Sequence, residues 1–126
     1  MKRLLIILTA GLTALLSFNS CEISRNEFDA SSIDAYLTVY YAGGISPVTV
    51  QGRYDLDYPR LSDREIESIF YDLSGLVQPG FLEATLEVEY FDWMDNYIGI
   101  DVFEFWWETY DMYTGDGAYL WEEVEP

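Results

Sequence analysis

The sequence contains no histidine, a single cysteine and no lysine beyond position 2. Without histidine, the chain has no Ser-His or Cys-His nucleophilic site and no histidine-ligated metal site. One cysteine allows no disulfide within the chain, and the shortage of lysine argues against a Schiff-base enzyme. Carboxylates, tyrosines, hydroxyls and a few arginines are the remaining reactive groups. We therefore expect no enzymatic activity, no cofactor and no metal site.

Basic residues are few, and all of them lie in the first 64 positions. They are Lys2, Arg3, Arg25, Arg53, Arg60 and Arg64. Residues 65–126 hold 16 acidic residues and no basic one. Such a negative field repels phosphate backbones and anionic lipid headgroups, which argues against a nucleic-acid partner. The same field attracts basic proteins and cations.

The first 20 residues have the layout of a secretion signal. Lys2 and Arg3 form a positive start, and residues 4–18 follow without a charge. This stretch suits the apolar core of a signal peptide and is shorter than the roughly 20 residues that a membrane-spanning helix needs. The signal ends in Phe-Asn-Ser-Cys, with Ser20 directly before Cys21.

This Ser-Cys ending resembles the lipobox of bacterial lipoproteins. The resemblance implies that signal peptidase II cuts before Cys21 and that Cys21 then carries the acyl chains. It also implies a location in the cell envelope, with the protein lipid-anchored to a bacterial membrane at its periplasmic face or at the cell surface. The alternative is an incidental cysteine near an ordinary cleavage site.

We divide the chain into a signal peptide at residues 1–20, a lipidated cysteine with a polar tether at residues 21–33, and one domain at residues 34–126. The processed chain keeps four arginines against 23 acidic residues, which is a formal charge of −19. Its length allows one modest core, and without a disulfide its stability must come from packing.

Two stretches early in the domain alternate between apolar and polar side chains, which is the period of a β-strand. They are residues 34–41 and 48–56, separated by a glycine-containing loop at residues 42–45. Two such runs joined by a short loop predict an antiparallel hairpin.

Residues 62–74 predict a helix. Ser62 and Glu65 have the spacing of a capping box, and Gly75 follows the last apolar position. The apolar positions recur at helical spacing, at Ile66, Ile69, Phe70 and Leu73. This single stripe predicts a helix that packs one face onto a sheet.

The second half of the domain predicts three more strands. Residues 82–91 alternate, a polar turn at 92–96 follows, and residues 97–109 have high β-propensity. Within 97–109 the apolar residues fall on both sides, which predicts either a bulge that shifts the register or a strand that is covered on both faces. A helix over Glu104–Tyr113 is the alternative. Residues 118–124 form the last expected strand.

The expected elements follow one another in the order ββαβββ. Strands outnumber helices, and every expected strand pair is joined by a short turn or by the single helix. The fold class is therefore α+β, with an antiparallel sheet of about five strands and one helix packed on it.

Aromatic residues crowd the second half. Twelve of the 32 residues from Tyr90 to Trp121 are aromatic, including all four tryptophans. We expect about two-thirds of them to fill the core or cover an edge, and the others to form a binding surface. The candidate binding residues are Trp93, in the turn at 92–96, and Trp107, opposite the side of its strand that carries Ile98.

Together these features predict a membrane-anchored, non-enzymatic binding module whose partner is more readily a basic protein than a sugar. The alternative ligand is a glycan stacked on exposed aromatic rings. A glycosidase built on two carboxylates is the third reading, because Glu87 and Glu89, or Glu104 and Glu108, have suitable spacing. With 23 acidic residues some such pair is expected by chance.

Overall fold

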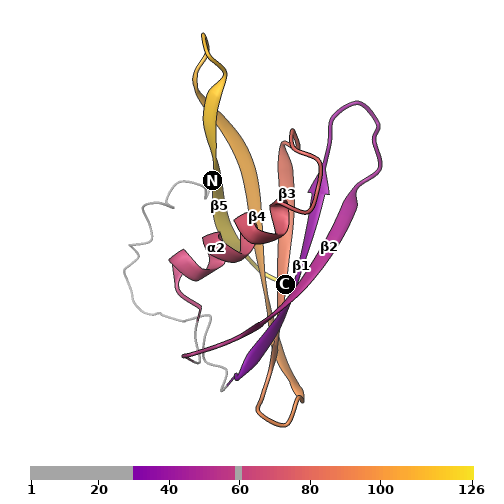
Figure 1. Ribbon diagram of the computed structural model, residues 1–126, viewed down its shortest axis with the longest axis vertical. Coiled ribbons are helices and arrows are strands. Elements are labelled where there is room, and N and C mark those ends of the chain that lie inside the picture. The colour runs from indigo at the N-terminus through magenta and orange to yellow at the C-terminus, as the bar shows by residue number, and fades with distance from the viewer. Residues whose placement is uncertain (1–29, 59–60) are drawn as a thin grey trace.

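A computed structural model of the protein describes residues 30–58 and 61–126. The predicted signal peptide, Cys21 and tether residues 22–29 lie outside the described residues. The described part forms one antiparallel five-stranded sheet with one helix, which confirms the α+β class (Figure 1). In chain order the elements are β1 (Ser32–Tyr40), β2 (Val48–Asp55), α2 (Asp63–Ser74), β3 (Glu83–Phe91), β4 (Tyr97–Asp111) and β5 (Asp116–Val124).

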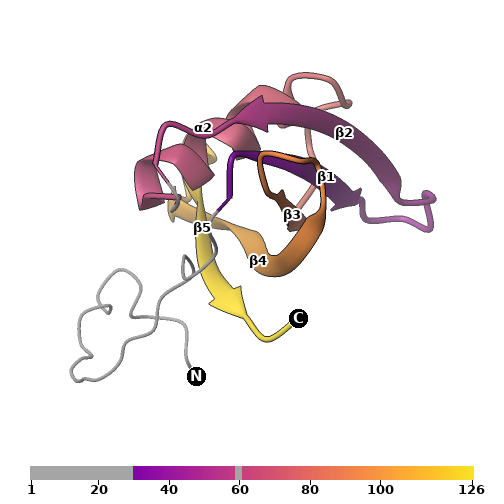
Figure 2. The same cartoon turned by 90° about the horizontal axis from the view of Figure 1, so that it is seen from below.

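The strands lie in the order β2-β1-β3-β4-β5. Because β2 and β3 both pair antiparallel with β1, they run in the same direction. Parallel strands need a crossover rather than a tight turn, and α2 provides it. The helix therefore covers one face of the sheet, and no helix of the described residues covers the other face (Figure 2).

The predicted alternation in the first strand corresponds to the inside and outside of the domain. Ile33, Ala35, Leu37 and Val39 are fully buried under α2, and the three residues between them are half-buried. The strand starts earlier than predicted. Ser32 and Ile33, the last two residues of the predicted tether, belong to β1 because Ile33 is a core residue.

The helix begins and packs as the sequence predicts. Ser62 is the N-cap, its hydroxyl accepts from the Glu65 amide, and the Glu65 carboxylate accepts from the Ser62 amide. The four apolar residues of the stripe are buried: Ile66, Ile69, Phe70 and Leu73. On β2, Gly52 allows the close approach, because a Cβ there would lie 3.0 Å from a Leu73 methyl group.

Residues 97–111 form the single long strand β4, so the alternative helix over Glu104–Tyr113 is wrong. The pairing of β4 with β3 and β5 is regular from Gly99 to Thr109, and register shifts occur only near the two ends of that stretch. Apolar residues lie on both faces of β4, but the expected cover on both faces is absent from the described residues, where the single helix covers one face. Phe103 and Phe105 are buried beneath α2, and Ile100 is half-buried on the uncovered face.

The uncovered face combines acidic, hydroxyl and apolar side chains. A row across four strands places Thr49, Thr38, Thr85 and Glu104 side by side. The Thr38 and Thr49 hydroxyls are 2.8 Å apart and share a hydrogen bond.

Among the described residues, no helix is long and apolar enough to cross a membrane.

Candidate binding surface

Most of the aromatic cluster is interior. Eight of the twelve aromatic residues between positions 90 and 121 are buried or half-buried, as predicted. Phe105 stacks on Phe70 of the helix, and Trp121 stacks on Phe105 at 6.0 Å between ring centroids. The Trp121 indole also donates to the Glu67 carboxylate at 2.9 Å. These rings bind α2 to β4 and β5. The four exposed aromatics are Trp93, Tyr97, Tyr110 and Tyr113.

Trp107, one of the two predicted binding residues, is half-buried in a structural contact. Its indole lies edge-on to the Tyr119 ring, with centroids 5.0 Å apart, and donates to the Thr109 hydroxyl at 3.1 Å. It also covers Gly117 of β5, where a Cβ would lie 2.6 Å from the indole ring. An aromatic side chain that covers a glycine on a neighbouring edge strand supports the pairing of the two strands.

Trp93, the other predicted residue, is 80% exposed in the turn between β3 and β4. Its neighbours Met94 and Tyr97 are 61% and 56% exposed. We call these three residues the β3–β4 tip. Trp93 follows the Phe91 end of β3, whereas Trp107 lies beside Leu82 at the start of β3. A nine-residue strand separates them, roughly 30 Å, so the two tryptophans do not form one surface.

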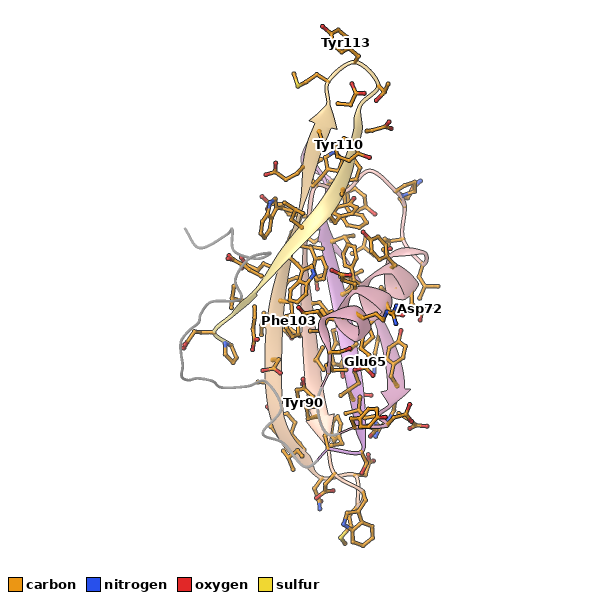
Figure 3. The ribbon with its side chains drawn as sticks, turned by 90° about the vertical axis from the view of Figure 1, so that its left-hand side faces the viewer. Glu65, Asp72, Tyr90, Phe103, Tyr110 and Tyr113 are labelled. Carbon is orange, nitrogen blue, oxygen red and sulfur yellow. The ribbon has the colours of Figure 1, made fainter. Side chains whose placement is uncertain are left out.

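The turn between β4 and β5 carries a second exposed cluster. Tyr110, Met112 and Tyr113 are 74%, 88% and 99% exposed. We call these residues the β4–β5 tip. The hairpin extends past the loops of the other strands, at the end opposite the β3–β4 turn (Figure 1). Tyr110 and Tyr113 lie at that end (Figure 3). Sequence reasoning missed this cluster, although the Tyr-Asp-Met-Tyr-Thr-Gly run combines turn residues with aromatics.

Asp111 gives the β4–β5 tip a defined shape. Its carboxylate accepts from the backbone amides of Tyr113 and Thr114, at 2.9 and 3.4 Å. The Gly115 amide donates to the Asp111 carbonyl at 2.8 Å, and Gly115 has a φ of +81°, which favours glycine. The turn therefore presents its aromatics on an ordered backbone.

The carboxylate pairs considered for glycosidase chemistry lie on the uncovered face. Glu87 and Glu89 are on β3, and Glu104 and Glu108 are on β4. A shallow groove of about 390 Å³ lies instead beside α2, between the helix and the end of β2. The pairs and the groove are therefore on opposite sides of the sheet.

Two of the acidic side chains that line the groove, Glu65 and Asp72, have structural partners. Glu65 completes the helix capping box, and the Tyr54 hydroxyl donates to the Asp72 carboxylate at 2.6 Å. Burial raises the pKa of Tyr54 above its ordinary value, and the hydrogen bond to Asp72 and its charge raise it further. Figure 3 shows Glu65 and Asp72 along the helix beside this groove.

Comparison with protein-family models, with curated proteins and with solved structures finds no significant match.

Proposed function

We propose that this protein is a membrane-anchored, non-enzymatic binding module whose partner is a basic protein. The observation that carries the proposal is the β4–β5 tip, where Tyr110, Met112 and Tyr113 stand exposed on an ordered turn. Aromatic residues and methionine are enriched at protein interfaces, and a few aromatic anchors carry most of the binding free energy. An exposed cluster of this kind at the end of a projecting hairpin suits a binding site.

The charge around this tip supports a basic partner. Glu108 and Asp116 are exposed beside it, and no basic residue occurs anywhere in residues 65–126. A negative field steers a basic partner toward the surface and rejects acidic ones. The aromatic residues then supply the contact area that charge alone does not.

The anchor is the lipid on Cys21 that the signal sequence implies. Each buried methylene contributes about 0.8 kcal/mol, so several acyl chains hold a domain of this size at a membrane. No basic patch is needed, and none is expected in so acidic a chain. The protein would then act in the cell envelope, at the periplasmic face or the cell surface.

A glycan is the second candidate ligand. Exposed tyrosine rings stack on sugar faces, and neighbouring carboxylates accept hydrogen bonds from sugar hydroxyls. The specific observation in its favour is the pair of exposed rings, Tyr110 and Tyr113, on the same turn.

Site-specific photo-crosslinking in the producing cell separates these candidates. A photoreactive amino acid replaces Tyr113 in one strain and Tyr58, which is 72% exposed outside the tip, in a control strain. We expect a covalent adduct with a basic protein from position 113 only. The yield should fall as ionic strength is raised before irradiation, because salt screens the attraction.

The tyrosines themselves provide the second measurement. With the captured protein as probe, the double variant Tyr110→Ser/Tyr113→Ser should bind at least about 30-fold more weakly, the effect of losing one strong aromatic anchor. Tyr58→Ser should leave binding unchanged. Equal adducts from both positions contradict a binding site at the tip. Salt-independent binding of a neutral oligosaccharide at the tip, without a protein adduct, favours the glycan.

A further inference from the structure

The β3–β4 tip is an exposed apolar cluster on a rigid turn. Trp93, Met94 and Tyr97 are each more than half exposed. The Asp92 carboxylate accepts from the amides of Met94 and Asn96, both at 2.9 Å, which fixes the loop. These bonds, led by that from Asn96, lower the pKa of Asp92, so it stays ionised and committed to the turn.

The charges at this tip are engaged with other groups of the domain. Arg53 of β2 forms ion pairs with Asp34 and with Asp95 of the turn, and it lies over the Phe91 ring at 5.0 Å. Its guanidinium also donates to the Ser32 hydroxyl at 2.9 Å. Arg53 and Arg64 are the two basic residues among those described. Arg53 therefore neutralises negative charge beside the exposed Trp93, in a domain that is otherwise strongly negative.

The chain enters the domain at this same end. The Ser31 amide donates to the Phe91 carbonyl at 2.8 Å, and Ser32 pairs with Phe91. Figure 1 shows the start of β1 and the β3–β4 turn together at the lower end of the molecule, with the β4–β5 tip at the upper end. A lipid anchor at Cys21 is therefore connected to the end of the domain that carries the β3–β4 tip.

The tether limits how the domain can stand on a membrane. Nine peptide steps join Cys21 to Ala30, and fully extended they span roughly 32 Å. The 15-residue strand β4 spans roughly 45–50 Å between the two ends of the domain. Standing on the β4–β5 tip would require a tether longer than the available one. A domain that stands upright on the membrane must therefore have its β3–β4 tip nearer the bilayer.

We propose that Trp93, Met94 and Tyr97 seat in the headgroup region of the membrane that holds the lipid on Cys21. This inference rests on the proposed anchor. Tryptophan and tyrosine favour the bilayer interface, where the ring is partly desolvated and its polar group stays hydrated. The headgroups that this tip contacts are those of zwitterionic phospholipids, because anionic headgroups repel the negatively charged domain. The lipid and the tip then form two attachment points that hold the β4–β5 tip away from the surface.

The test places one fluorophore at each tip of the acylated, full-length processed protein. Acylation consumes the thiol of Cys21, the only cysteine, so Met94→Cys and Met112→Cys each introduce a single reactive thiol. Both positions are exposed methionines in hairpin turns, which makes them a matched pair. The labelled proteins are reconstituted into phosphatidylcholine vesicles, with and without brominated acyl chains.

We expect a label at position 94 to be quenched by brominated lipid and shielded several-fold from aqueous iodide. A label at position 112 should show the reverse. Adding Trp93→Ser to the Met94→Cys variant should reduce both the lipid quenching and the shielding. Equal iodide quenching at the two positions overturns the seating. Shielding at position 94 without quenching by brominated lipid also overturns it, since it means a protein contact.

Intact-mass measurement of the same preparations separates this inference from the anchor on which it rests. An acyl mass on Cys21 together with a water-exposed label at position 94 overturns the seating and leaves the anchor standing. Absence of the acyl mass in the wild-type protein overturns the anchor, and the seating with it.

Discussion

Phe70 of α2 and Phe105 of β4 lie face to face, with ring centroids 3.9 Å apart and an interplanar angle of 3°. Both side chains are at most 2% exposed. The helix backbone comes closest to β1 and β2. Phe70 connects the helix to the second half of the sheet, together with the hydrogen bond between Glu67 and Trp121. Tyr119 of β5 adds an edge contact to Phe70 at 5.3 Å.

Removing one partner of this stack should lower the stability of the folded protein. Phe105→Ala should lower the free energy of unfolding by about 3–5 kcal/mol, because it removes a buried ring and leaves a cavity. Urea denaturation followed by circular dichroism measures the change. The control is Tyr113→Ala, which removes a ring that is 99% exposed and should cost less than about 0.5 kcal/mol. Equal effects for the two variants would contradict the core assignment.

Two leucines near the end of α2 test the packing of the helix. Leu73 is 2% exposed and Leu76, just past the helix, is 66% exposed. Leu73→Ala should cost roughly 2–5 kcal/mol and Leu76→Ala a small fraction of that, because only the first leaves a cavity. The same urea experiment compares them. A negligible loss for Leu73→Ala would mean that the helix is not packed on the sheet.

Gly117 should not tolerate even one methyl group. A Cβ there would lie 2.3 Å from the Glu108 carbonyl oxygen and 2.6 Å from the Trp107 ring, so β4 and β5 would have to separate. We expect Gly117→Ala to destabilise the protein by at least about 1–3 kcal/mol.

The matched control is Gly75→Ala. Gly75 ends the helix with a φ of −68°, and its nearest contact for a Cβ is 3.5 Å. Alanine fits there and should be neutral or stabilise by up to about 1 kcal/mol, through the unfolded chain. Thermal unfolding of both variants decides the point. The prediction fails if the two alanines have the same effect.

Tyr54 should make stability fall at alkaline pH. Burial, followed by the bond to Asp72 and its charge, raises the pKa of the Tyr54 hydroxyl above its ordinary value of 10.0. A raised folded-state pKa means that the stabilisation is fully present below pH 10 and is lost as the pH rises above that value. The wild-type protein should therefore melt higher than Tyr54→Phe at pH 8, and the gap should shrink toward pH 11. A gap that stays constant across this range would exclude the linkage.

Lipidation at Cys21 is directly measurable. Cells that produce the wild-type chain should incorporate a clickable palmitate analogue into it, because the signal ends in a lipobox-like Ser-Cys. The Cys21→Ser variant has no thiol for acylation and should remain unlabelled. Label retained in that variant would mean that the acyl chain is attached elsewhere.

Local pattern was enough to predict the secondary structure. The capping box at Ser62 and the apolar stripe specify α2, because a helix start and a helical period involve only neighbouring residues. The period-two runs specify β1 and β3 in the same way. The sequence also allows a helix over residues 104–113, and pairing with the neighbouring strands decides in favour of β4.

The sequence by itself determined the α+β class, the buried stripe of the helix and the acidic character of the domain. Only the tertiary structure decided which aromatics are exposed. Trp107 is half-buried because Gly117 of the neighbouring strand leaves room for its indole, and Trp93 is exposed because no other part of residues 30–58 and 61–126 covers its turn. The structure also placed the start of β1 beside the Trp93 turn and the Tyr113 turn at the far end. Such relationships depend on strand order and on which face the crossover helix covers, and contacts between distant residues set both.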